Sequence, residues 1–184
     1  MPAGYQAAVA SFIKEENRHA ALLAGMVTHL GGKVKRRHWS AWAFKRVRRL
    51  IPRLEFEVQI LLSAELIACA YYGLLARHSP AGLIRRGCAA LVKDEVSHIS
   101  FHVDLFSERL SAWLPLGKAL WRTQFQVLFL AAETLVWWEH GALFRDLGIN
   151  RCAFVRQSRR ACVSFLERLE TPALRAGAAF QQPA

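Results

Sequence analysis

The amino-acid sequence predicts an all-α protein built as a helical bundle. Only six prolines occur among its 184 residues, and β-branched runs bounded by turn residues are nearly absent. Long segments rich in Ala, Leu and Arg carry apolar residues at helical spacing. The hydrophobic content of 53% is ample for one well-filled core. We therefore expect a single helical-bundle domain over residues 1–170 and a frayed C-terminal tail over residues 171–184.

Periodicity and the residues that start and stop helices predict five helices. Gly31 and Gly32 are expected to end the first helix, and Pro52 is expected to lie in the first turn of the second. Pro115 separates the third helix from the fourth, which closes at Gly148. The expected helices span about residues 5–30, 52–78, 81–113, 115–144 and 150–169.

The connections between these helices indicate how the chain is threaded. Only a few residues around Ser79 and Pro80 separate the second and third helices, and short connections make antiparallel neighbours. The much longer connection over residues 31–51 can travel the length of a bundle and return the chain to its starting end. We expect a helical turn within it, around residues 39–50. The sequence thus predicts an antiparallel bundle with a long crossover and extra C-terminal helices.

Two Glu-x-x-His motifs, Glu16 with His19 and Glu95 with His98, carry the chemistry of the sequence. Residues three apart on a helix project from one face, so a carboxylate and an imidazole at this spacing can reach one metal pair. Both motifs lie on the apolar stripe of their helix and are expected to be buried. Glu65 stands alone in the apolar run LLSAELIACAYY of the second helix. Three expected helices therefore each direct a carboxylate toward the core.

Buried carboxylates need a counter-charge, because an unpaired buried charge costs several kcal/mol. Neither Lys nor Arg lies on these stripes, so a metal is the natural partner. Carboxylate and imidazole ligands without thiolate suit iron or manganese more than structural zinc. A core Glu or His with a hydrogen-bond partner is the alternative for each residue alone, whereas the joint pattern favours a metal site. The predicted ligands are Glu16, His19, Glu65, Glu95 and His98.

These motifs resemble the ferritin-like di-iron carboxylate superfamily, which includes rubrerythrins, ribonucleotide reductase small subunits and di-iron hydroxylases. Its plan is Glu, Glu-x-x-His, Glu and Glu-x-x-His on four successive helices. The resemblance covers about residues 8–110 and places Glu16 with His19 on the second of these helices, Glu65 on the third and Glu95 with His98 on the fourth. It implies a ferritin-like fold, two iron ions as cofactor and chemistry with dioxygen or peroxide.

The superfamily's first helix, with its own Glu, would precede residue 1 in this alignment. Glu133 is a candidate substitute because it lies on a core-facing stripe; its alternative is a core Glu bonded to a Trp or Tyr side chain. His102 follows His98 by one turn and is a candidate for an additional ligand or for a residue that orients a carboxylate. Glu15 and Asp94 point off the stripes, so we expect solvation or pairing with a neighbouring Lys or Arg.

The formal charge of +11 is concentrated in residues 33–53, where Trp39, Trp42 and Phe44 interleave with cations. This mixture is typical of docking to an acidic partner or an anionic surface. Its alternative is a solvated connection whose aromatic residues pack back onto the bundle. Nucleic acid is disfavoured because no base-reading motif is present, and a homodimer is compatible with the sequence. The candidate docking residues are Lys33, Lys35, Arg36, Arg37, Lys45, Arg46, Arg48 and Arg49.

A cytoplasmic protein is expected. The N-terminal residues lack the features of a secretory signal. The apolar segment 125–144 is interrupted by Glu133, Glu139 and His140, so we interpret it as a core helix and not a membrane span. The four cysteines show no CxxC spacing. We expect them to be small buried residues with reduced thiols, as is typical of a reducing compartment.

Three classes of function fit the sequence. The first is a di-metal oxidoreductase that activates dioxygen or peroxide on an unidentified substrate, with Tyr71 and Tyr72 lining a substrate path or simply filling the core. The second is an iron-oxidising storage or detoxification module. The third is a metal-free helical interaction protein that docks through residues 33–53.

Overall fold

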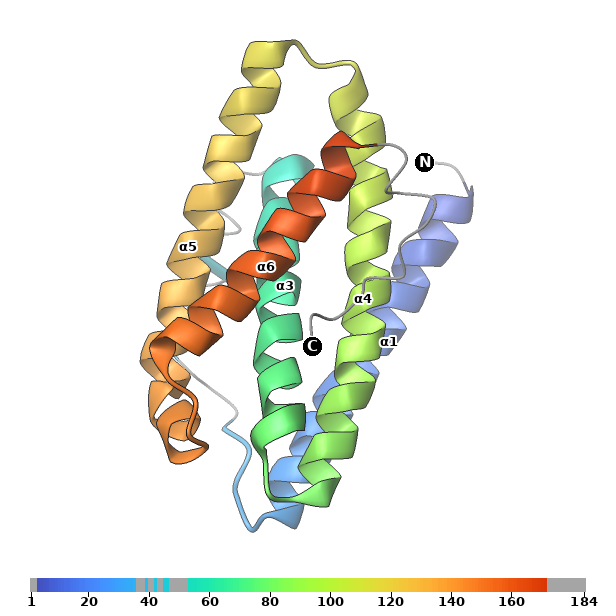
Figure 1. Ribbon diagram of the computed structural model, residues 1–184. Helices are drawn as coiled ribbons and strands as arrows, with labels where there is room; N and C mark the ends of the chain where they lie inside the picture. Colours follow the sequence, from blue (N-terminus) through green and yellow to red (C-terminus); the bar gives the residue numbers. More distant parts are fainter. Residues whose placement is uncertain (1–2, 36–38, 40–41, 43–44, 47–52, 172–184) are drawn as a thin grey trace.

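The computed structural model describes residues 3–35, 39, 42, 45–46 and 53–171, and these residues contain helices and no strand. The all-α prediction is confirmed, and the observed helix ends lie close to the predicted ones. The described residues form α1 (Ala3–His29), α3 (Leu54–His78), α4 (Gly82–Ser111), α5 (Pro115–Asp146) and α6 (Arg151–Glu170), as Figure 1 shows.

The residues that predicted the helix ends also form them. Gly31 and Gly148 adopt φ angles of 76° and 73°, a left-handed conformation that glycine tolerates best. Pro115 lies in the first turn of α5, where a backbone N–H would have no acceptor within the helix, so its absence costs no hydrogen bond. The side chain of Asn150 accepts a hydrogen bond of 2.9 Å from the backbone N–H of Ala153 and so caps α6.

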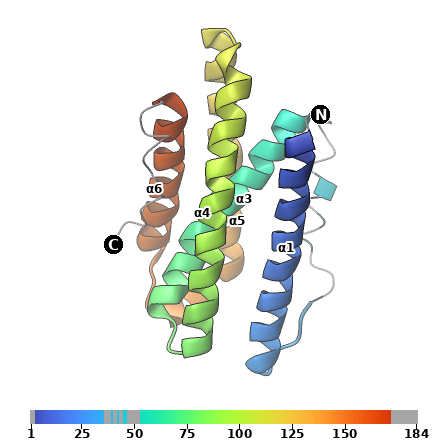
Figure 2. The ribbon, with the colours of Figure 1, turned by 90° about the vertical axis from the view of Figure 1, so that its right-hand side faces the viewer.

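Helix α3 is central and packs against α4, α5 and α6, whereas α1 packs against α4. Figures 1 and 2 show that α1 and α3 run in the same direction. The chain therefore starts α3 at the same end of the bundle as α1. Helices α3, α4, α5 and α6 then alternate in direction. Most of the helical turn expected at residues 39–50 lies outside the described residues.

The main hydrophobic core lies between α3, α4, α5 and α6. Six phenylalanines fill it, and each is at most 2% exposed. Trp121 stacks on Phe125 at a ring-centroid distance of 5.5 Å. Among the described side chains of α1, only His19 and Met26 are buried. Helix α1 is therefore attached through few apolar contacts, and the candidate site lies at that interface. The core phenylalanines are Phe106, Phe125, Phe129, Phe144, Phe154 and Phe165.

Helix α3, and not the segment 125–144, is the most apolar candidate for a membrane span among the described residues. Its most apolar window has a mean hydropathy of 1.6, but 72% of that window is buried inside the bundle. Core packing therefore accounts for its apolar character. In segment 125–144, Phe125, Phe129 and Phe144 face the core, as expected for a core helix.

The cysteines depart from expectation at one position. Cys69, Cys88 and Cys162 are buried, as predicted for small apolar residues, but Cys152 is exposed. Cys152 lies in the first turn of α6 and faces solvent, whereas Phe154, two residues later, is buried in the core. All four thiols are free.

Candidate metal site

The two Glu-x-x-His motifs meet across the interface of α1 and α4. His98 Nδ1 lies 3.4 Å from Glu16 Oε1 and 3.5 Å from Glu95 Oε2. His19 Nδ1 lies 3.6 Å from both Glu16 Oε1 and Glu95 Oε1. Glu16, Glu95 and His98 offer ligand atoms that all lie within 4.8 Å of one another. Ligand atoms about 2 Å from one metal ion are separated by distances of this order, so the cluster has the dimensions of a metal site.

The outer nitrogen of each histidine faces a different carboxylate. His98 Nε2 lies 3.1 Å from Glu15 Oε2, and His19 Nε2 lies 3.1 Å from Asp94 Oδ2. A carboxylate at Nε2 holds the proton there and leaves the lone pair of Nδ1 directed at the inner carboxylates. The geometry thus prepares both Nδ1 atoms to bind a cation.

Glu15 and Asp94 therefore have a role that the sequence did not reveal. Asp94 does pair with Arg18 at 2.6 Å, as expected of a solvated acid beside a cation. Both carboxylates, however, also contact the histidine of the opposite motif. The sequence feature that could have revealed this role is the pair of adjacent acidic residues at each motif, Glu15-Glu16 and Asp94-Glu95.

Glu65 and His102 form a buried pair beside this cluster. His102 Nε2 lies 3.0 Å from Glu65 Oε2 and 3.2 Å from Glu65 Oε1, and the two residues are only 2% and 4% exposed. This contact corresponds to the second role considered for His102, in which it orients a carboxylate. Burial and then the charge of Glu95 raise the pKa of Glu65 well above its usual value.

The protonation of the cluster follows from its burial and charges. Burial alone would lower the pKa of His98, but the carboxylates of Glu95, Glu65 and Glu15 outweigh it and raise that pKa to about 9. Burial and the nearby His98 lower the pKa of His102 to about 4, so His102 is neutral and donates to Glu65. Without a metal, a proton on His98 therefore supplies part of the counter-charge at neutral pH.

Several buried atoms of the cluster lack a hydrogen-bond partner. They are Glu65 Oε2, Glu95 Oε2, His98 Nδ1 and His102 Nδ1, since the hydrogen bond of His102 Nε2 goes to Glu65 Oε1. Leaving such an atom unsatisfied costs about 1–3 kcal/mol. Because the first three belong to predicted ligands, a bound cation would satisfy them, and the residues present fit a metal.

Glu16 departs from the prediction of burial. Its side chain is 43% exposed, whereas His19 is buried as expected. The reason is that α4 is the main neighbour of α1 among the described helices, and the side of Glu16 turned away from α4 is exposed. The cluster therefore opens to solvent at Glu16, which offers a path for an ion. Burial and then the charge of Glu95 raise the pKa of Glu16.

Glu133 contacts residues of α6 and not the cluster between α1 and α4. Its carboxylate accepts a hydrogen bond from the Ser158 hydroxyl and lies 3.5 Å from Arg159 Nε, both on α6. Glu133 is buried, as expected. Its contacts are those of a bonded core Glu, with a serine in place of the expected Trp or Tyr. Of the predicted ligands, the structure gathers Glu16, His19, Glu95 and His98, with Glu65 adjacent.

The basic segment is described in part. Lys33, Lys35, Lys45 and Arg46 are exposed, whereas Arg36, Arg37, Arg48 and Arg49 lie outside the described residues. Trp39 contacts Trp138 of α5 at a ring-centroid distance of 5.4 Å, although both rings stay largely exposed. At Trp39, the connection thus packs against the bundle.

No protein-family model, curated protein or solved structure matches this chain. Function is therefore inferred from the chemistry of the cluster, which combines carboxylates and imidazoles without thiolate.

Proposed function

We propose that this chain is a ferritin-like di-metal oxidoreductase in which Glu16, His19, Glu65, Glu95 and His98 bind two iron or manganese ions. The observation that carries the proposal is the reciprocal contact of the two motifs around buried oxygen and nitrogen atoms that have no hydrogen-bond partner. Two divalent ions would neutralise the inner carboxylates and replace the proton on His98.

When bound, the metal pair supplies the redox chemistry that activates dioxygen or peroxide. The chain's own residues prepare the site. Glu16 and Glu95 lie between the two imidazoles, and His102 holds the carboxylate of Glu65. The outer carboxylates Glu15 and Asp94 fix the orientation of the imidazoles.

Metal analysis of the purified protein tests the proposal. Protein expressed with added iron and manganese should contain about two ions per chain, the number that paired Glu-x-x-His motifs hold. Glu95→Ala should reduce this to below one ion. Glu133→Gln is the matched control, since Glu133 is equally buried but contacts α6. Less than one ion in the unaltered chain, with no change in Glu95→Ala, would overturn the proposal.

Two further measurements separate the oxidoreductase from an iron store. An oxidoreductase consumes dioxygen in proportion to an added reductant, and Glu95→Ala should abolish this consumption. A storage protein instead oxidises added ferrous iron repeatedly and assembles into shells, which size-exclusion chromatography detects.

A further inference from the structure

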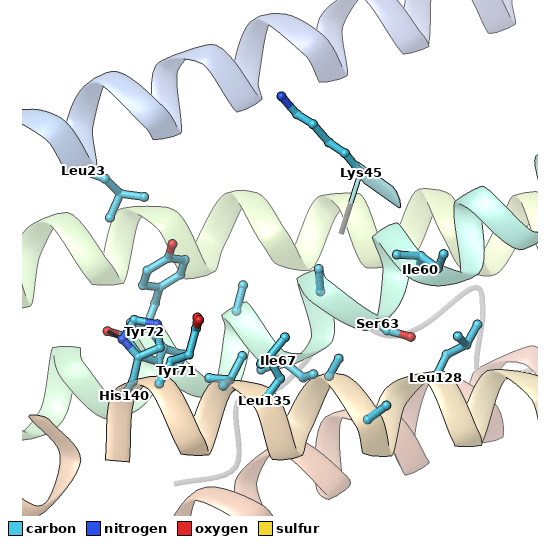
Figure 3. A pocket seen from close by; sticks show the side chains of 16 residues that line it. Leu23, Lys45, Ile60, Ser63, Ile67, Tyr71, Tyr72, Leu128, Leu135 and His140 are labelled. Carbon is cyan, nitrogen blue, oxygen red and sulfur yellow. Dashed lines mark hydrogen bonds between the residues drawn. The ribbon is translucent and has the colours of Figure 1, made fainter. Parts of the chain in front are cut away.

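A chamber of about 740 Å³ lies between α3 and α5, with Leu23 of α1 and Lys45 at its border (Figure 3). This volume lies within the range of about 300–1,000 Å³ that small-molecule sites occupy. Ten of its sixteen lining residues are apolar. The chamber therefore has the size and the surface of a binding site for an apolar molecule.

Four alanines create the space. Ala64 and Ala68 of α3 and Ala131 and Ala132 of α5 line the chamber. Ala64 and Ala131 are exposed, because no larger side chain fills the volume that they face. At 1.5 Å of rise per residue, the lining of α3 from Ile60 to Tyr72 extends about 18 Å. The chamber is thus long enough for an extended hydrocarbon chain.

Polar groups occupy defined places in the lining. Tyr71, Tyr72 and His140 lie together at one end in Figure 3, and the Tyr71 hydroxyl lies 3.5 Å from His140 Nδ1. Glu139, next to His140 on α5, also lines the chamber, so the anionic end of a ligand is expected away from this end. Lys45 borders the chamber away from this group, and its exposed ammonium points toward α1. Among the described lining residues, Lys45 carries the only ammonium or guanidinium group. A ligand with one anionic end would pair with it.

We propose that this chamber binds a single-chain fatty acid, with the hydrocarbon between α3 and α5 and the carboxylate at Lys45. Apolar walls stabilise the chain by removing it from water. The single cation selects a carboxylate end over a neutral one, and the net charge of +11 attracts anionic ligands generally.

The chamber also lies beside the candidate metal site. Ala64 and Ala68 flank Glu65 on α3, and Tyr72 follows Glu65 by two helical turns on the same face. Burial, and then the charge of Glu95, raise the pKa of the Tyr72 hydroxyl. A fatty acid bound here is therefore a candidate substrate. That assignment rests on the proposed function, whereas binding itself does not.

Calorimetric titration of the metal-free full-length chain with octanoate, decanoate and dodecanoate tests the binding. Each added methylene should tighten the dissociation constant about fourfold. Lys45→Glu should weaken dodecanoate binding at least tenfold and leave dodecanol binding unchanged. Lys118→Glu, an exposed lysine of α5 outside the lining, is the control and should match the unaltered chain. Binding that does not depend on chain length, or an equal loss in both lysine variants, would contradict the proposal.

Filling the chamber gives an independent test. Ala64→Phe and Ala131→Phe should each abolish dodecanoate binding, while Ala119→Phe, at an exposed position of α5 outside the lining, should not. Circular dichroism verifies that each variant is folded. Folded variants that bind dodecanoate normally would overturn the proposal. It would also be overturned if the unaltered chain bound no dodecanoate and instead formed a dimer in which a second copy covers the chamber at Ala131. Glu95→Ala should retain dodecanoate binding, so failure of the metal site and failure of the chamber are distinguishable.

Discussion

His98 Nε2 on α4 lies 3.1 Å from Glu15 Oε2 on α1, so one motif orients the imidazole of the other. The reverse contact joins His19 Nε2 to Asp94 Oδ2, also at 3.1 Å. Because α1 and α4 are antiparallel, the acidic residue that precedes each Glu-x-x-His motif reaches the histidine across the interface. The two motifs therefore form one site, and neither can prepare its ligands alone.

Removal of the outer carboxylate tests this relationship. Glu15→Ala should weaken metal binding about 10–100-fold, because the imidazole of His98 loses the group that fixes its orientation. The measurement is a Co²⁺ or Mn²⁺ titration of the metal-free protein. Glu108→Ala, at an exposed position of the same helix as His98, is the control. Equal affinities of these two variants would show that Glu15 does not position His98.

Metal affinity should rise with pH. The pKa of His98 is raised to about 9 in the metal-free protein, so a metal must displace its proton below that pH. Release of one proton predicts about a tenfold tighter dissociation constant for each pH unit between pH 6.5 and 8.5. Titrations in buffers of different ionisation enthalpy count the protons released. Affinity that is independent of pH over this range would contradict the assignment of Nδ1 of His98 as a ligand.

The stability of the metal-free protein should fall as pH rises, whereas metal affinity increases. A histidine whose pKa is higher in the folded state stabilises that state below its unfolded pKa of 6.5, and this contribution is lost as pH rises toward about 9. The raised pKa of Glu65 acts in the same direction, since its buried carboxylate is disfavoured when charged. Denaturant unfolding should show a loss on the order of 2 kcal/mol between pH 6.5 and 9. His98→Asn should reduce this slope, whereas a slope unchanged in that variant would assign the loss to other groups.

Helix α1 should depend on the metal for its attachment. Among its described side chains only His19 and Met26 are buried, so a cation shared between α1 and α4 would add much of the interface energy. Hydrogen exchange should slow at least tenfold over residues 10–29 on metal addition, and change little in α6. Glu95→Ala should lack this protection. Uniform slowing of all helices would instead indicate general stabilisation.

The fold was predictable because its determinants are local. The helix ends at Gly31, Pro115 and Gly148 reflect backbone preferences that the sequence displays directly. Spacing within a helix likewise indicated that Glu95 and His98 share a face. Contacts between helices were not predictable in the same way. The exposure of Glu16 and the pairing of Glu133 with Ser158 depend on how α1 and α6 pack, which no spacing within one helix records.

The exposed thiol of Cys152 should react first with iodoacetamide. Burial raises the pKa of Cys88 to about 11, and burial together with Glu133 raises that of Cys162 to about 11, so their thiolates are scarce at neutral pH. Cys69 is likewise buried, with a raised pKa. Peptide mass spectrometry at pH 8 should find one rapidly modified residue, and Cys152→Ser should remove that modification. Rapid modification of Cys69 instead would show that α3 is accessible in solution.

Ser158→Ala decides whether Glu133 belongs to the core of the fold or to the metal site. The variant removes the hydroxyl that donates to a buried carboxylate, so it should lower the free energy of unfolding by about 1–3 kcal/mol. Because the contacts of Glu133 lie on α6, metal content and affinity should stay unchanged. Ser164→Ala, on the same helix, controls for helix propensity. The double variant with Glu133→Leu should recover part of the lost stability, since it also removes the buried carboxylate that has lost its hydroxyl donor. A fall in bound metal in Ser158→Ala, at a temperature where the protein remains folded, would instead place Glu133 among the ligands and make Ser158 the residue that orients it.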